Sequence, residues 1–227
     1  MQNFATPAPI TTVLDLQAGR VRLVAGDRAD TTVEVRPADP AKRRDVTAAE
    51  QTTVTYADGV LRIHAPEAKN QYFGPSGALE VTVELPAGSR VEARAASCEL
   101  RGVGRLGEVA FDGAYRRIKL DHAASVQLTA TDGDVEVGRL AGSADISTAR
   151  GDIRIAEAGP GTVTLTTQAG SIEVGAAAGV SASLDAGTSY GRISNSLAST
   201  GAAELRIQAT TSQGDIVARS LTAPAAG

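Results

Sequence analysis

The sequence predicts an all-β fold: a parallel β-helix-like solenoid with repeats of about 18–23 residues, preceded by an antiparallel β section. A Gly-Asp-Val-Glu-Val motif at Gly133 recurs in altered form at Gly151, Gly170, Gly191 and Gly214, at spacings of 18, 19, 21 and 23 residues. Apolar and polar residues alternate on both sides of each glycine, which is the period of a β-strand. Aromatic residues make up only 3% of the chain, so the core must be built from small aliphatic side chains, which suits flat stacked coils.

The first ninety residues alternate apolar and polar residues in six short runs, which we expect to be strands: 11–16, 20–25, 31–36, 52–56, 60–65 and 79–85. Asp58-Gly59 predicts a hairpin turn between the fourth and fifth runs. The segment 37–45 is rich in Pro and charge, and could continue into a short helix through Ala48 and Ala49. We expect this part to begin the solenoid and to cover its first edge, because an uncovered edge strand invites aggregation.

Two series of apolar residues run through the repeats and are expected to point inward. One series is Leu128, Ile146, Leu165, Leu184 and Leu205, and the other is Val135, Ile153, Ile172, Ile193 and Ile216. Stacked in sequence order, they place the coil of Ile216 at the C-terminal end, where little beyond Pro224 would cover it. Extra residues are expected near 186–190 and 210–213. The resulting division is 1–90 as antiparallel section and cap, 91–221 as solenoid repeats, and 222–227 as a disordered tail.

Composition excludes several classes of function. The net charge of −4 in 227 residues provides no basic field for nucleic acid or an anionic membrane. No apolar run approaches the roughly eighteen residues that a membrane helix needs. The single cysteine, Cys98, cannot form an internal disulfide and is expected to be a small buried thiol. Residues 1–10 contain two prolines and no apolar core, which predicts a cytoplasmic protein without a secretory signal.

Three segments together resemble a known family: the Gly-[Asp/Ser]-[Val/Ile]-x-[Val/Ile] repeat, the lead-in Gly-Arg-Val-Arg-Leu at 19–23, and Val-Glu-Leu-Pro-Ala-Gly at 83–88. The chain is similar over residues 11–219 to the bacterial putative-adhesin β-strand-repeat family, a domain of unknown function. The resemblance implies a parallel β-helix-like solenoid. The family name suggests adhesion, which requires export by some route.

The turn residues Gly133, Asp134, Gly151, Asp152, Gly170, Gly191, Gly214 and Asp215 are predicted to be structural, because Gly supplies positive φ and Asp bonds to nearby backbone. Stacked carboxylates could instead bind Ca²⁺ or, through Asp132, Asp134 and Asp152, act in carbohydrate hydrolysis. Ser171 and Arg192 interrupt this row, and the motif is not the calcium-binding nonapeptide of β-rolls. The structural interpretation is therefore preferred.

The sequence contains no arrangement of nucleophile, base and orienting group, so we expect no catalysis, no cofactor and no metal. We expect a scaffold or protein-interaction module that binds a protein partner or a second copy of itself. The two candidate contact sites are the weakly covered C-terminal end and the adjacent aromatics Tyr72 and Phe73. The alternatives are a surface adhesin and a carbohydrate-binding or carbohydrate-active solenoid.

Overall fold

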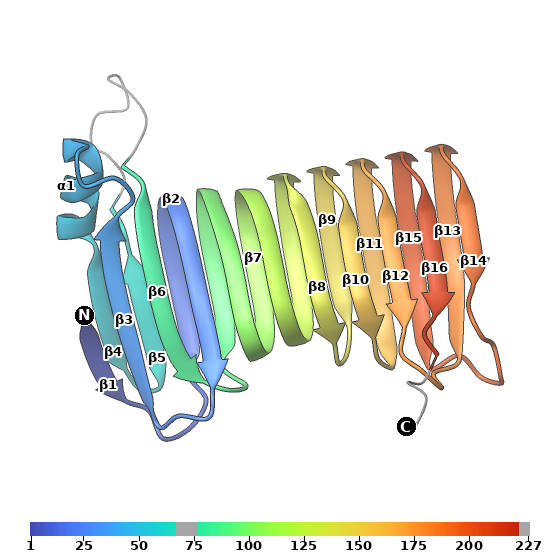
Figure 1. Ribbon diagram of the computed structural model, residues 1–227, viewed down its shortest axis with the longest axis horizontal. Coiled ribbons are helices and arrows are strands. Elements are labelled where there is room, and N and C mark those ends of the chain that lie inside the picture. The colour runs from blue at the N-terminus through green and yellow to red at the C-terminus, as the bar shows by residue number, and fades with distance from the viewer. Residues whose placement is uncertain (67–76, 223–227) are drawn as a thin grey trace.

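The computed structural model describes residues 1–66 and 77–222 and is almost entirely β (Figure 1). Strands stack along one long axis, and their pairings connect sixteen strands. The described residues contain a single α-helix, α1 (Arg43–Gln51), at the position where a short helix was expected. No helix among them is long and apolar enough to cross a membrane. The predicted parallel β-solenoid with an antiparallel beginning is confirmed.

Each coil of the solenoid contains two strands joined by a glycine turn. β8 (Asp134–Leu140), β10 (Ile153–Ala158) and β12 (Ile172–Ala176) pair in parallel on one face. β9 (Ala144–Arg150) and β11 (Gly161–Ala169) pair in parallel on the other. The inward-facing Ile146, Leu165 and Ile172 are fully buried, as predicted. The core is therefore a thin aliphatic layer between two parallel sheets.

The coils at the C-terminal end do not follow the order of the chain. β13 (Ala182–Tyr190) and β14 (Ile193–Ser196) form the outermost coil (Figure 1). β15 (Leu205–Gln213) pairs with both β11 and β13, and β16 (Ile216–Ser220) pairs with both β12 and β14. The last coil in sequence is thus inserted between the two coils that precede it.

This insertion corrects the predicted order of the two apolar series. Ile172 neighbours Ile216, which neighbours Ile193, and Ile216 is only 1% exposed instead of weakly covered. Ile193, expected inside, is 47% exposed because no further coil lies beyond it. In the other series Leu165 neighbours Ala209 and not Leu184. All these coils share a period of two, so alternation alone does not determine their order.

The inserted coil has the side chains that an interior position requires. Ala218 packs inward between Val174 and Asn195 of the neighbouring strands, so the end strand β14 is the one that carries the polar residue. On the outer surface Glu173 bonds Arg219 of β16 at 2.8 Å. Chain connections lengthen toward the end, from 159–160 to 177–181 to 197–204. The extra residues lie in these connections, whereas the expected insertions at 186–190 and 210–213 belong to β13 and β15.

The parallel stack begins earlier in the chain than expected. β2 (Thr11–Gly26) pairs in parallel with β5 (Val60–His64), β6 (Leu79–Pro86) and the long strand β7 (Arg90–Asp132), which winds around the solenoid (Figure 1). The expected boundary at residue 90 is therefore not a break in the sheet. Antiparallel pairing is confined to β1 (Gln2–Ala5), β3 (Asp30–Pro37) and β4 (Thr53–Ala57) with their neighbours.

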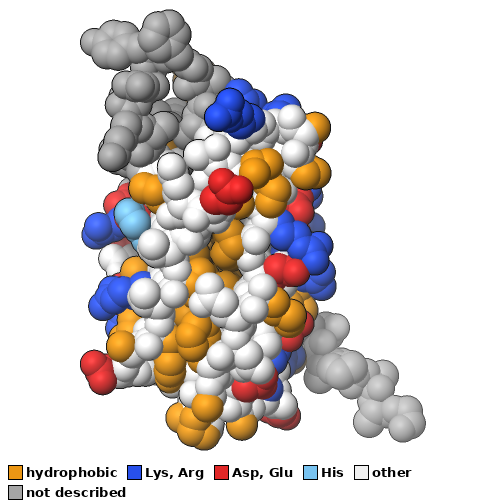
Figure 2. Space-filling model, turned by 90° about the vertical axis from the view of Figure 1, so that its left-hand side faces the viewer, with side chains coloured by type: hydrophobic (Ala, Val, Ile, Leu, Met, Phe, Trp, Pro, Cys, Tyr) orange, Lys and Arg blue, Asp and Glu red, His pale blue; other side chains and the backbone are white. Residues whose placement is uncertain are grey.

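Short antiparallel strands and α1 cover the N-terminal end. The rings of Phe4 in β1 and Tyr56 in β4 lie 5.5 Å apart, joining the edges of the two faces. The buried Asp45 of α1 accepts a hydrogen bond from the backbone N–H of Ala78, which precedes β6. Figure 2 looks onto this end, where hydrophobic side chains form a broken band between charged margins. Short edge strands are a common protection against unwanted pairing.

The inserted coil generates a prediction for hydrogen exchange. β15 and β16 have a paired strand on each side, whereas β13 and β14 have a paired strand on one side only. Peptides covering 205–220 should therefore exchange their amide hydrogens more slowly than peptides covering 182–196. Mass spectrometry after brief deuterium labelling measures this ranking. Faster exchange in 205–220 would show that the coils stack in sequence order.

Candidate functional site

The five glycine turns form one column along an edge of the solenoid, in the order Gly133, Gly151, Gly170, Gly214 and Gly191. Gly151 has a φ of +126°, and a Cβ there would lie 2.0 Å from the carbonyl oxygen of Gly133. Gly170 and Gly214 meet the preceding turn at the same distance. Glycine is required here because adjacent turns touch through their backbones.

The turn carboxylates bond to the backbone of the neighbouring coil. Asp134 Oδ1 accepts from the N–H of Asp152 at 3.0 Å, and Asp152 Oδ1 accepts from the N–H of Ser171 at 2.7 Å. Ser171 Oγ accepts from the N–H of Asp215 at 3.3 Å, and Asp215 Oδ1 accepts from Arg192 at 2.8 Å. Ser171 therefore continues the row instead of breaking it, and the geometry is that of a structural turn.

A second polar row lies just inside the turns. The hydroxyls of Thr167, Thr211 and Thr188 donate to the carbonyl oxygens of Gly151, Gly170 and Gly214, at 2.9–3.2 Å. Thr148 similarly donates to the carbonyl of Arg150. Each of these threonines stands three residues before its turn glycine. This Thr-x-x-Gly spacing is a second sequence signal for the same turn. The threonine lies before the glycine motif and is not part of it.

The alternative roles of the turn carboxylates receive no geometric support. Asp132, Asp134 and Asp152 are exposed along the turn edge, and Asp132 lies 3.8 Å from the guanidinium of Arg150. A glycosidase needs two carboxylates facing each other across a substrate groove. Across the described ranges 1–66 and 77–222, no three acidic, histidine or cysteine side chains are grouped to hold a metal ion.

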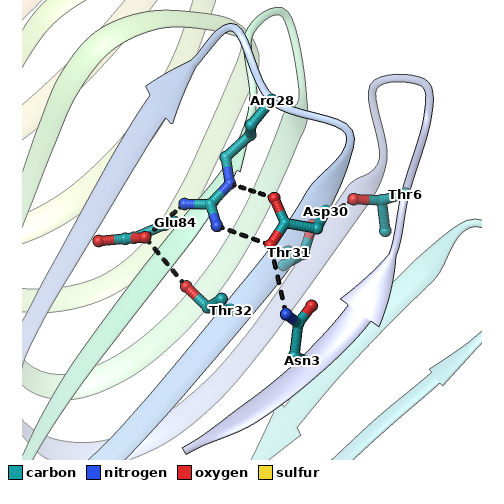
Figure 3. Close-up of polar contacts among 7 residues, drawn as sticks. All are labelled: Asn3, Thr6, Arg28, Asp30, Thr31, Thr32 and Glu84. Carbon is teal, nitrogen blue, oxygen red and sulfur yellow. Dashed lines mark hydrogen bonds and ion pairs between the residues drawn. The ribbon is translucent and has the colours of Figure 1, made fainter.

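A separate polar cluster fastens the N-terminal strands (Figure 3). Arg28, between β2 and β3, makes two 3.0 Å bonds to the carboxylate of Asp30 and a further bond to Glu84 of β6. Thr32 donates to Glu84 at 3.1 Å, and Asn3 of β1 donates to Asp30 at 3.3 Å. Hydrogen bonding to Arg28 lowers the pKa of both carboxyls and raises that of the guanidinium. The cluster ties β1, β3 and β6 together, and its charges are engaged with each other.

The C-terminal end presents two large exposed hydrophobic side chains. Apart from Met1, the large hydrophobic side chains that are exposed in the described part of the chain are Tyr190, at 76%, and Ile193, at 47%. They flank the Gly191 turn of the outermost coil. Leu184 and Leu197 of the same coil are only half-buried. The other predicted contact residues, Tyr72 and Phe73, lie outside the described residues.

The only cysteine of the chain lies deep in the core. Cys98 is 2% exposed, and burial raises the pKa of its thiol to about 12. A thiolate is the reactive form of cysteine, so this side chain is held in its unreactive state at neutral pH.

Residues 105–219, from β7 through β16 and including all five glycine turns, match the family model Toastrack DUF4097. This stretch covers just over half of the 227 residues. The chain belongs to the Toastrack DUF4097 family. The resemblance identified from the sequence motifs is thereby confirmed.

Two solved structures are similar to this Toastrack chain, and only the first has a TM-score above 0.5. A putative adhesin from Bacteroides fragilis is 14% identical, with a TM-score of 0.51 and coverage of 96% of this chain and 95% of that chain. A putative cell adhesion protein from Clostridium sporogenes is 13% identical, with a TM-score of 0.38 and coverage of 97% and 98%. Such identities indicate a likeness of fold alone. A search of curated proteins finds no match.

The glycine column predicts a strong effect of a single methyl group. Gly151→Ala should lower the free energy of unfolding by about 2–3 kcal/mol, because it combines a strained φ with a backbone collision. For a chain of this size that corresponds to a melting temperature lower by about 5–10 °C. Gly26→Ala is the matched control, since nothing lies within 4 Å of a Cβ at that position. Equal melting temperatures for the two variants would contradict the prediction.

The Arg28 cluster predicts a dependence of stability on pH. Asp30 and Glu84 have pKa values in the folded state below their ordinary 3.8 and 4.5. Their contribution to folding stability is therefore fully present above the ordinary values, and it is lost as the pH falls through the lower folded-state values. The stability difference between the unmodified chain and Arg28→Gln, measured by urea unfolding, should therefore shrink below about pH 4. Arg36→Gln, which removes an exposed ion pair with Glu34, is the control and should have little effect at pH 7. A difference for Arg28→Gln that grows on acidification would contradict this assignment.

Proposed function

We propose that this Toastrack chain is a non-enzymatic, adhesin-like scaffold that works through protein contact, and that its contact site is the end coil formed by β13 and β14. The exposure of Tyr190 and Ile193 at that coil carries the proposal. Large hydrophobic side chains exposed together on a folded surface mark interaction sites. Tyrosine is also among the residues enriched at the centre of protein interfaces.

The longer edge strand of this coil, β13, lacks the usual protection against pairing. β13 and β14 contain no proline and no lysine, and their single charged residue is Asp185. Natural edge strands are commonly protected by such residues, by bulges or by a covering element. At the opposite end, short antiparallel strands and α1 provide that cover. The difference between the two ends supports the C-terminal end as the place of contact.

The non-enzymatic part of the proposal is supported by how the polar groups are used. The carboxylates of Asp134, Asp152 and Asp215 accept backbone hydrogen bonds within the turn column. A hollow of about 630 Å³ on β2 and β7 contains Arg90, whose guanidinium bonds Glu92 and Glu108 at 3.1 and 3.3 Å. Asp15, which also lines this hollow, lies 3.1 Å from Nδ1 of His64, so these charged groups are engaged with one another on the sheet surface.

Adhesion at a surface is the second candidate, favoured by the description of the Bacteroides fragilis protein as a putative adhesin. A cytoplasmic scaffold and a surface adhesin would use the same contact end and differ in location. Cell fractionation with an antibody against the chain separates them: protein in the cytoplasmic fraction alone supports the first, and protein accessible outside the cell supports the second.

A photo-crosslinking amino acid placed at Tyr190 tests the contact site in cells that express the protein. We expect irradiation to produce covalent adducts at this position, because the side chain is exposed on an uncovered edge. Placement at Val103, on the outer surface of β7, is the control and should give none. Placement at Tyr72 tests the second contact site that the sequence suggests. Adducts at Val103 or Tyr72 without adducts at Tyr190 would refute the assignment of the contact end.

A further inference from the structure

We infer that the partner of the end coil is a second copy of this chain, which pairs antiparallel to β13 across a twofold axis. The inference rests on the proposed function, because it identifies what covers the same contact end. The product would be a closed dimer of two solenoids joined end to end, with β13 of each copy at the junction. Closed twofold dimers are the commonest symmetric assemblies, and the same surface is then used by both copies.

The first argument is the free backbone edge of β13. On its inner side β13 pairs with β15, beginning with the N–H of Leu205, which donates to the carbonyl oxygen of Ser181 at 3.1 Å. In a parallel ladder, alternate residues of a strand bond to one neighbour, so the intervening N–H and C=O groups of β13 face the other side. The N–H of Ala182 already donates to the carbonyl oxygen of Ala198 at 3.0 Å, so the groups that another strand can pair with are those of alternate residues from Leu184 to Tyr190.

The second argument is that the two ends of the molecule do not match each other. A head-to-tail contact would place residues 184–190 of β13 against β1, with four residues, or β4, with five. Both of those strands run antiparallel to their neighbours, and α1 lies at the same end. A second β13 offers the same length and the same exposed apolar residues. End-to-end pairing through identical strands is thus the better geometric match.

The third argument is the distribution of charge and bulk along β13, which favours one register. Asp185 is its only charged residue, and a register centred on Asp185 would place the two carboxylates opposite each other. A register centred on Ala186 instead places Asp185 opposite Gly187 of the second copy, where nothing lies within 4 Å of a Cβ. This register therefore separates the like charges.

Disulfide trapping tests this register directly, because the native Cys98 is buried and will not compete. In the register centred on Ala186, the cysteines of an Ala186→Cys variant lie opposite each other across the twofold axis. Their Cα atoms are then within the separation of about 4–7 Å that a disulfide spans. Mild oxidation should convert most of this variant to a covalent dimer. Ser183→Cys is the matched control on the same strand, since its two copies would lie about 20 Å apart in the dimer and should form no disulfide.

Light scattering after size exclusion tests the assembly itself. The intact chain, of 23.1 kDa, should have twice that mass in solution. Replacing both Tyr190 and Ile193 by Ser should convert it to a monomer with unchanged far-UV circular dichroism. Replacing Val24 and Val103 by Ser is the control, because it removes two hydrophobic side chains from the outer surface away from the ends, and this variant should remain dimeric.

Three outcomes would overturn the inference. They are a monomer at every concentration, a series of larger species that indicates head-to-tail stacking, and crosslinking through Ser183→Cys in place of Ala186→Cys. A monomer in solution whose position 190 forms adducts only with another protein in cells would reject the second copy as partner. It would leave the contact end, and so the proposed function, intact.

Discussion

The close contact between backbones of successive coils is the constraint on which the rest of this structure depends. Parallel strands of neighbouring coils must stay about 4.8 Å apart to pair, and this spacing holds even where the chain turns. At the turn edge the carbonyl oxygen of one coil therefore occupies the space that a Cβ of the next would need. Glycine at each turn, the carboxylate or hydroxyl that follows four of the five glycines and the threonine three residues before four of them are all consequences of that spacing.

The spacing also explains how much of the fold the sequence predicts. A period of two between glycine turns identifies the coils and their inward faces. The order of the last two coils is not predicted, because both satisfy the same alternation. The signal that distinguishes them is small: Ala218 in β16 against Asn195 in β14, at positions that face each other in the register. Where a core position can hold Asn, the strand belongs at an end.

In the candidate site, the sequence predicts the turn residues but not the exposed hydrophobic pair. The turn residues are recognisable from sequence because their role depends on contacts that repeat in every coil. The exposed pair Tyr190 and Ile193 is not recognisable, since Ile193 occupies the same repeat position as the buried Ile172 and Ile216. Its exposure arises only from the absence of a coil beyond β14. A contact site at the end of a repeat array is a property of coil order, and a repeat motif does not encode that order.

The inserted coil also bears on how the protein is made. A solenoid whose coils stack in chain order can add each coil as it leaves the ribosome, because the preceding coil is already in place. Here the outermost coil is synthesised before the coil that separates it from the rest. Until residue 220 has emerged, β13 and β14 lack β15 and β16, the strands with which they pair. Completion of this fold therefore depends on the final twenty or so residues, and a chain interrupted before them lacks an interior layer and not merely a tail.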